Sequence, residues 1–250
     1  MTAGAAVKDF DRDGYAILRA LAPAAMRERM LEIARAHLTA ATPPLEYEAD
    51  VQYPGAPATH EAPGGRTVRR LLQAYARDAV FAQWATSPQL RARLVSLLGP
   101  AIQLSQAHHN CIMTKDPSYG SLTSWHRDIR YWSFERPELV SVWLALGRES
   151  IENGCLLVIP GSHAMDFDAG RLDEAQFLRT DVEANRHLLA TQFPVELQPG
   201  DVLFFHSRLF HAAGRNQTRN TKLSVVFTYH DAANRPLPGS RSAALPDIPL

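Results

Sequence analysis

An imidazole and a carboxylate lie two residues apart at His126 and Asp128. In an extended strand, residues i and i+2 project to the same face, so this spacing would place the two side chains side by side. A metal site needs at least one more protein ligand, and His206 and His211 occur further along the chain. Two histidines and one carboxylate on one face of an octahedron leave the opposite face open, as in non-haem Fe(II) oxygenases. By itself, the His-x-Asp pair also fits a surface histidine beside a solvated acid.

The elements that would position these residues are short, β-prone segments that begin at residue 101. Turn residues such as Asn153-Gly154 and Pro160-Gly161 separate them. Because they follow one another closely without crossover helices, they favour an antiparallel sandwich or barrel over a parallel α/β sheet. The segments are residues 101–115, 139–147, 155–161, 191–197, 201–206 and 223–230.

The first third of the chain has helical patterns that would cover this β-core. Apolar residues recur near one helical face in residues 24–40, and helices are also predicted over 68–78 and 87–99. A short strand over 15–18 precedes them. We expect a single domain over residues 1–250, mainly β with a helical cover (α+β). Its helical portion spans about 1–100 and its β-core about 101–230.

Two segments stand outside this pattern. Residues 42–65 are rich in proline and glycine and long for a connection in a compact domain, so we expect a functional flap or a mobile loop. Residues 164–189 form an acidic and polar insert with helical spacing that interrupts the series of strands. Both are candidates for selecting a substrate.

Charge and composition exclude several classes of protein. The 250-residue chain has 26 basic and 26 acidic residues, so no electrostatic reason exists to expect nucleic-acid binding. No apolar run approaches the roughly 18–20 residues of a membrane span, and the N-terminus lacks a signal-peptide core. The two cysteines, Cys111 and Cys155, do not make a disulfide framework, and we therefore expect a cytoplasmic protein.

Several blocks of sequence occur in an order and spacing that resemble the phytanoyl-CoA dioxygenase family of Fe(II)/2-oxoglutarate oxygenases. The resemblance extends from Phe10 to about Tyr229. It implies a double-stranded β-helix, which is a cupin-like jelly roll and agrees with the strand pattern. The blocks are Phe10–Tyr15, Lys115–Pro117, Trp125–Asp128, Trp143–Leu146, Asn153–Leu156, Ile159–His163, and Pro199–Asp201 followed by His211 and Asn216.

The resemblance also implies which residues bind the metal. It assigns His126, Asp128 and His211 as Fe(II) ligands, because His211 is followed by Asn216 as in the family. His206 is then expected in the core or behind the ligands. The implied reaction is hydroxylation of a small molecule with 2-oxoglutarate and O₂ as cosubstrates and succinate and CO₂ as coproducts. A carboxylate at position 128 favours hydroxylation over halogenation.

One departure from the family concerns the cosubstrate. The family usually has Arg eleven residues after the distal histidine, whereas this chain has Lys222. Lysine can pair with the far carboxylate of 2-oxoglutarate as a point charge, but lacks the planar fork of arginine. Ser224 could add a hydroxyl on the same strand face, and Trp143 could form a wall of the pocket. Arg219 and, less favourably, Arg215 are the alternatives for the cation.

The substrate is less constrained by the sequence. We expect a small molecule of lipid or sugar-acid type, and an anionic one if several arginines converge at the barrel mouth. In residues 107–115, two alternating polar sets could line that mouth, and the sequence does not select between them. The alternative function is a non-catalytic or differently metallated jelly roll that binds a ligand. The arginines concerned are Arg66, Arg69, Arg70, Arg127, Arg130 and Arg148.

Overall fold

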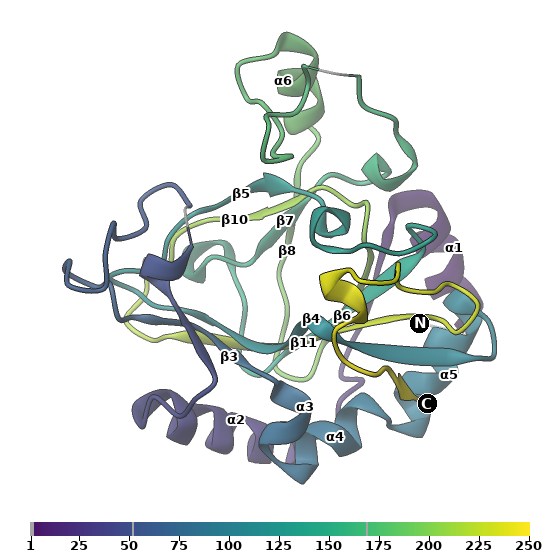
Figure 1. Ribbon diagram of the computed structural model, residues 1–250, viewed down its shortest axis with the longest axis horizontal. Coiled ribbons are helices and arrows are strands. Elements are labelled where there is room, and N and C mark those ends of the chain that lie inside the picture. Colours follow the sequence, from purple (N-terminus) through teal and green to yellow (C-terminus); the bar gives the residue numbers. More distant parts are fainter. Residues whose placement is uncertain (1–2, 52, 169) are drawn as a thin grey trace.

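The computed structural model describes residues 3–51, 53–168 and 170–250 and consists of two facing antiparallel sheets (Figure 1). The larger sheet has the order β1 (Tyr15–Leu18), β9 (Val202–His206), β6 (Leu139–Ala145), β11 (Lys222–Asp231), β4 (Ile102–Lys115), β3 (Val68–Leu72) and β2 (Leu45–Tyr47), with β12 (Ile248–Pro249) paired to β4. The smaller sheet has the order β5 (Thr123–His126), β10 (His211–Ala213), β7 (Leu156–Val158) and β8 (Phe193–Val195). The expected antiparallel architecture is therefore confirmed.

Strand β11 shows how the two faces of the larger sheet differ. Its residues are buried from Lys222 to His230, as expected for a central strand covered on both sides. Val225 and Phe227 belong to the apolar cluster that includes the helices, whereas Val226 belongs to the cluster shared with the smaller sheet. Because alternate residues of a strand face opposite sides, Lys222 and Ser224 project with Val226 into the space between the sheets.

Helices cover the outer face of the larger sheet (Figure 1). Helix α5 begins at Pro88, which suits a first helical turn, and ends before Gly99, whose φ of 93° favours glycine. Leu90 and Leu94 on this helix are fully buried in the core. The other helices are α1 (Ala3–Asp13), α2 (Ala24–Thr39), α3 (Ala74–Arg77), α4 (Ala79–Ala85) and α6 (Glu183–Leu189). No helix in the described ranges combines the length and apolar character needed to cross a membrane.

The helix predicted over residues 68–78 is wrong. Val68–Leu72 instead forms β3, and only Ala74–Arg77 is helical. Leu71 pairs with Ile112 of β4, so pairing with a long neighbouring strand overrides the local helical spacing. Gln73 then adopts a left-handed conformation (φ 54°) that separates the strand from the helix.

The two unusual segments have little regular structure. The 42–65 segment contains β2 and the 3-10 helix η1 (Glu48–Asp50). In the described part of the 164–189 insert, α6 is the one α-helix, and Ala164 ends a 3-10 helix. The remaining 3-10 helices are η2 (Asp128–Tyr131), η3 (Ile151–Asn153), η4 (Ser162–Ala164) and η5 (Arg241–Ala243).

Strand β4 contains an irregularity that matters for the site. Asn110 pairs with Phe227 of β11, but the next pair along joins Ser105 with Thr228. Residues 106–109 therefore have no partner on β11 and form a large bulge. Such bulges redirect side chains that simple alternation would place elsewhere.

Candidate metal centre and adjoining cation cluster

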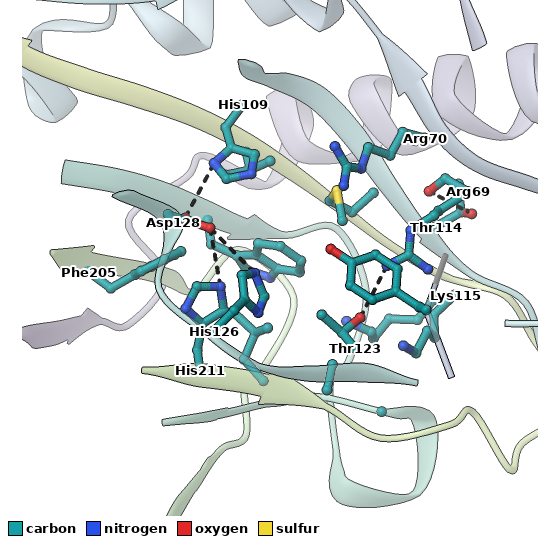
Figure 2. Close-up of a pocket in the computed structure, with 18 of the residues that line it drawn as sticks. Arg69, Arg70, His109, Thr114, Lys115, Thr123, His126, Asp128, Phe205 and His211 are labelled. Carbon is teal, nitrogen blue, oxygen red and sulfur yellow. Dashed lines mark hydrogen bonds and ion pairs between the residues drawn. The ribbon is translucent and has the colours of Figure 1, made fainter. Parts of the chain in front are cut away.

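A cavity of about 60 Å³ lies between the two sheets and receives side chains from both (Figure 2). His126, Asp128 and His211 line one part of it, and Arg69, Arg70, Lys115 and Lys222 line another. We call these parts the metal end and the cation end.

At the metal end, the three expected ligands converge. His126 ends β5 and pairs in register with His211, the first residue of β10. One ligand atom from each of the three residues lies within 4.8 Å of the others. Nε2 of His211 is 3.4 Å and Nε2 of His126 is 3.7 Å from Oδ1 of Asp128.

The reason for this convergence differs from the one expected. Asp128 is not in the strand with His126, as the i, i+2 argument required, but begins the 3-10 helix η2. The strand-face argument is therefore wrong, because the backbone leaves the strand at Arg127. The turn into η2 brings the carboxylate back toward the two paired strand residues.

Backbone carbonyls fix the two imidazole rings. Nδ1 of His126 is 2.8 Å from the carbonyl oxygen of Ser124, and Nδ1 of His211 is 3.0 Å from that of Leu209. A carbonyl oxygen only accepts, so each Nδ1 donates its proton, and Nε2 is the atom directed at Asp128. This is the orientation that histidine ligands of metals adopt when a second hydrogen bond holds the ring.

The Asp128 carboxylate is held from its other side. Ser141 Oγ donates to Oδ2 at 3.2 Å, and Nδ1 of His109 lies 3.3 Å from the same oxygen. Burial alone would raise the pKa of Asp128, but the adjacent His109 and His211 outweigh it and hold the pKa well below its usual range. The carboxylate is therefore ionised and available to a cation.

The two imidazoles differ in their affinity for a proton. Burial, reinforced by His211, lowers the pKa of His126 far below its usual value, so this ring is neutral. Burial also lowers the pKa of His211, but the charge and hydrogen bond of Asp128 more than compensate and raise it. Because a metal binds the imidazole only when Nε2 has no proton, the raised pKa of His211 makes metal binding pH-dependent. Two imidazole nitrogens and one carboxylate, all buried, are a donor set that fits Fe(II).

The cation end departs from the expected cosubstrate contacts. Lys222 Nζ lies 3.2 Å from Oε2 of Glu149, a carboxylate that the sequence analysis did not single out. Ser224 Oγ donates to the other oxygen of Glu149 at 2.6 Å, and Trp143 Nε1 donates to it at 2.9 Å. All three residues expected to meet 2-oxoglutarate therefore meet one buried carboxylate. Lys222 and Trp143 line the cavity.

Lys115 is a second buried lysine at this end, and its charge is less well compensated. Its Nζ donates to the Ser121 carbonyl at 2.7 Å, and no carboxylate of the described residues lies within 4 Å of it. Burial, reinforced by Arg69, lowers the pKa of Lys115 to about 7. By contrast, Arg69 pairs with Glu48 at 3.2 Å and Arg70 with Glu46 at 3.1 Å.

The residues considered as alternatives for the metal and cosubstrate contacts lie outside the cavity. Arg219 and Arg215 are exposed, and neither lines the cavity. His206 stacks near Phe10 and His163 and accepts the backbone N–H of Arg208 at 3.0 Å, so it lies away from the metal end, as expected. Asn216 is buried and donates to the Lys115 carbonyl at 2.8 Å, which ties the segment after β10 to the end of β4.

Sequence reasoning missed three groups that complete the site. His109 reaches Asp128 from β4. Residue alternation groups His109 with Met113 and Lys115, which also line the cavity, but it did not select this set or reveal the contact with Asp128. Glu149 follows β6, outside any strand that the sequence predicts, and forms an isolated β-bridge with Leu197. Lys115 was part of a family-like block, but its spacing alone assigned it no role.

An antiparallel jelly roll with a buried cluster of two histidines and one aspartate between its sheets defines a protein of the mononuclear metal-binding, cupin-like class. A family model described as phytanoyl-CoA dioxygenase (PhyH) matches residues 10–224. The chain belongs to this family, and the expected fold is confirmed.

Curated relatives are similar over different lengths. A probable phytanoyl-CoA dioxygenase of Caenorhabditis elegans is 27% identical over 184 residues, which are 69% of this chain and 57% of that protein. The ectoine dioxygenase of Sphingopyxis alaskensis is 26% identical over 245 residues, or 90% of this chain and 75% of that protein. The chain spans about half the length of the phytanoyl-CoA dioxygenases it matches.

Solved structures share the fold. The S. alaskensis EctD structure with 2-oxoglutarate and 5-hydroxyectoine has a TM-score of 0.75 at 22% identity, covering 95% of this chain and 78% of that one. The epimerase SnoN, in complex with Fe3+, alpha ketoglutarate and nogalamycin RO, has a TM-score of 0.74 at 24% identity and covers 98% and 93%.

Proposed function

We propose that this protein is an Fe(II)- and 2-oxoglutarate-dependent dioxygenase that hydroxylates a small molecule, with residues 1–250 acting as one oxygenase domain. The observation that carries the proposal is the buried cluster of His126, Asp128 and His211, whose donor atoms converge within 4.8 Å. Family membership supports the same chemistry. An apolar cluster that extends from Phe10 to Tyr229 supports a single domain.

The chain's own residues would orient and protect the metal ligands. The Ser124 and Leu209 carbonyls hold the protons on Nδ1 of the two rings, so that Nε2 of each is free to bind. Ser141 and His109 hold one carboxylate oxygen of Asp128 and leave the other facing the imidazoles. When bound, Fe(II) would supply the redox chemistry and open positions for a 2-oxo acid and O₂.

We assign the far carboxylate of 2-oxoglutarate to Lys115 together with Lys222. Lys115 has no carboxylate within 4 Å among the residues that the structure describes, whereas Glu149 already balances part of the Lys222 charge. Trp143 would form a wall of this pocket, and Ser224 would position Glu149 rather than touch the cosubstrate. Arg219 is not part of the proposed pocket, because it is exposed and outside the cavity lining.

Charge balance supports this assignment. The cavity lining and its ion-pair partners contain as many side-chain cations as carboxylates, so a divalent cation and a dianionic cosubstrate would together leave the site neutral. The cations are Arg69, Arg70, Lys115 and Lys222, and the carboxylates are Glu46, Glu48, Asp128 and Glu149.

One observation favours the alternative of a ligand-binding or differently metallated jelly roll. Glu149 already forms an ion pair with Lys222, the lysine that would otherwise bind the cosubstrate carboxylate. Under this alternative, the metal end would hold a metal such as zinc, and 2-oxoglutarate would not be consumed.

Succinate release from 2-oxoglutarate separates the two functions. Protein loaded anaerobically with Fe(II) and then exposed to O₂ should release succinate, and Asp128→Ala should lose at least about 100-fold in metal affinity and all measurable release. His206→Gln is the matched control, because His206 lies away from the metal end, and it should retain both. Tight Zn(II) binding without Fe(II)-dependent succinate release would instead establish the alternative.

We also propose a cytoplasmic location. Cys111 and Cys155 are both free and buried, as expected for a protein kept in a reducing compartment. Disulfide-linked protein recovered from cells under non-reducing conditions would contradict this location.

A further inference from the structure

A second, larger cavity adjoins the metal centre. Its volume is about 460 Å³, which suits a small organic molecule. Tyr53, Arg70, His109 and Tyr131 line both cavities, so a molecule in the second one would lie next to the metal end.

Two arginines in this second cavity have no acidic partner. Arg130 and Arg241 both line it, and no carboxylate of the described residues lies within 4 Å of either. Glu46 is the one carboxylate among the described lining residues, and it pairs with Arg70 at 3.1 Å. The cavity therefore has two uncompensated positive charges.

Aromatic contacts hold Arg130 in place. Its guanidinium carbon lies 3.9 Å from the centroid of the Phe177 ring and 5.0 Å from that of Tyr131. Nη1 of Arg130 also donates to Tyr131 Oη at 3.5 Å, and the other N–H groups of the guanidinium can donate to an anion. This arrangement suits recognition of a carboxylate or phosphate.

Arg241 comes from a segment outside the family-matched residues 10–224. We call residues 232–250 the C-terminal strap. Ile248 of the strap pairs with Leu104 of β4, and the Pro246 carbonyl accepts a hydrogen bond from Gln106 at 2.7 Å. Next to Arg241, Ser242 Oγ accepts the backbone N–H of Ser133 at 2.9 Å. Before Arg241, the backbone N–H of Leu237 donates to the Ser133 carbonyl at 2.8 Å, so the backbone is anchored on both sides of Arg241.

The strap also contacts the end of β11. His230 Nε2 lies 3.2 Å from Asp247 Oδ2, and the His230 ring packs on Phe134 at 4.7 Å. Close to Arg241, burial and the arginine charge lower the pKa of His108 to about 3, so His108 stays neutral. Among the described lining residues, Glu46 balances Arg70, and the remaining polar wall of the second cavity has a positive potential from Arg130 and Arg241.

We propose that Arg241 and Arg130 bind the anionic group of the substrate, and that the substrate is a small organic acid or phosphate ester with an apolar body. The apolar part would extend past Tyr131 toward His126, Asp128 and His211. The role of this molecule as substrate rests on the proposed function, but its binding by the two arginines does not.

Matched probes test the proposal on metal-free protein. 3-Phenylpropionate and 3-phenylpropionamide differ in charge but hardly in shape, and isothermal titration calorimetry gives the affinity of each. We expect the acid to bind at least about 10-fold more tightly than the amide. Arg241→Gln and Arg130→Gln should each remove most of this preference and leave the affinity for the amide unchanged. Phenyl phosphate distinguishes phosphate esters from carboxylates as the preferred class.

Controls separate this site from its surroundings. Arg136 is exposed and far from the lining, so Arg136→Gln should preserve the preference. Lys115→Ala should also preserve it, which distinguishes the arginine site from the cation end. Arg241→Lys should keep part of the preference, and an unchanged melting temperature would exclude a folding defect. Equal affinity for acid and amide, whether both bind or neither does, overturns the proposal.

The outcome is independent of the proposed activity. Acid binding that depends on Arg241, in a protein that releases no succinate with Fe(II), would retain the anion site and reject the oxygenase. Succinate release by a protein that binds the acid and the amide equally would support the oxygenase and reject the anion site.

Discussion

The metal end and the cation end of the cavity are built in different ways. At the metal end, the two histidines are oriented by carbonyls two residues before them in the chain. At the cation end, Lys222 is balanced by a carboxylate 73 residues away, and Arg69 by one 21 residues away. The orientation of the two rings at the metal end thus depends on local backbone geometry, whereas the balance of charge at the cation end depends on residues that only the complete fold brings together.

This difference predicts opposite responses to substitution. Removing a metal ligand should abolish metal binding and leave the fold intact, because the backbone that orients the remaining ligands is unchanged. Removing a carboxylate from the cation end should affect the fold itself, because a buried charge loses its partner. The following predictions test this contrast in order of expected effect.

Glu149→Gln should produce the largest change in stability. It leaves Lys222 buried beside a neutral amide, which costs about 3–5 kcal/mol and lowers the melting temperature by about 6–20 °C. 2-Oxoglutarate should raise the melting temperature of this variant more than that of the wild type, because its carboxylate replaces the missing charge. Differential scanning fluorimetry with and without 2-oxoglutarate measures both effects.

Glu152→Gln is the matched control, since Glu152 lies three residues away in η3 but is exposed. Its melting temperature should equal that of the wild type. If Glu149→Gln were equally silent, the cation end would not depend on charge balance, and the contrast between the two ends would fail.

Lys115→Ala should have an intermediate effect, which is confined to the binding of 2-oxoglutarate. Loss of one charged hydrogen bond should raise the KM for 2-oxoglutarate by about 10- to 100-fold with little change in Fe(II) affinity. Initial rates of succinate release at varied 2-oxoglutarate measure the first quantity, and metal titration the second. An unchanged KM would remove Lys115 from the proposed pocket.

The same lysine predicts a pH dependence. Because burial lowers the pKa of Lys115 to about 7, its positive charge is present below that pH and is lost as the pH rises through it. The affinity for 2-oxoglutarate should therefore fall between pH 6.5 and 9 in the wild type. Lys115→Arg keeps its charge over this range and should give a flat profile. A decline of equal slope in both proteins would assign the pH dependence to another group.

Arg219→Ala should have the smallest effect. Arg219 is exposed and outside the cavity, so the KM for 2-oxoglutarate should change less than about twofold. A 10-fold rise would restore Arg219 as the cosubstrate cation and would remove the need for Lys115.

The metal end was largely predictable from sequence, and the cation end was not. His126, Asp128 and His211 carry recognisable spacing and family-like neighbours, and the structure brings them together. The argument that placed Asp128 on the strand was nevertheless wrong, because local spacing does not show where a strand stops. Glu149 could not be inferred, since nothing in a turn sequence reveals that the fold will bury its carboxylate beside Lys222.

The helical segments show the same limit. Residues 87–99 form the expected helix because proline and glycine mark its two ends locally. Residues 68–72 were predicted as helix but form β3, since their pairing with β4 decides their conformation. The placement of Arg69 and Arg70 in the cavity therefore required the sheet, and no local pattern could supply it.

The bulge at residues 106–109 is a position at which the size of the two cavities can change without a change in the rest of the sheet. Ser105 and Asn110 stay paired with β11 on either side, so the register of the sheet does not depend on the length between them. That intervening stretch supplies His109 to the metal centre and Gln106, Ala107 and His108 to the second cavity. An insertion or deletion of one residue there would change the shape of both cavities, while Cys111, Met113 and Lys115 would keep their positions. The longest strand of the protein thus combines a fixed scaffold with one adjustable segment.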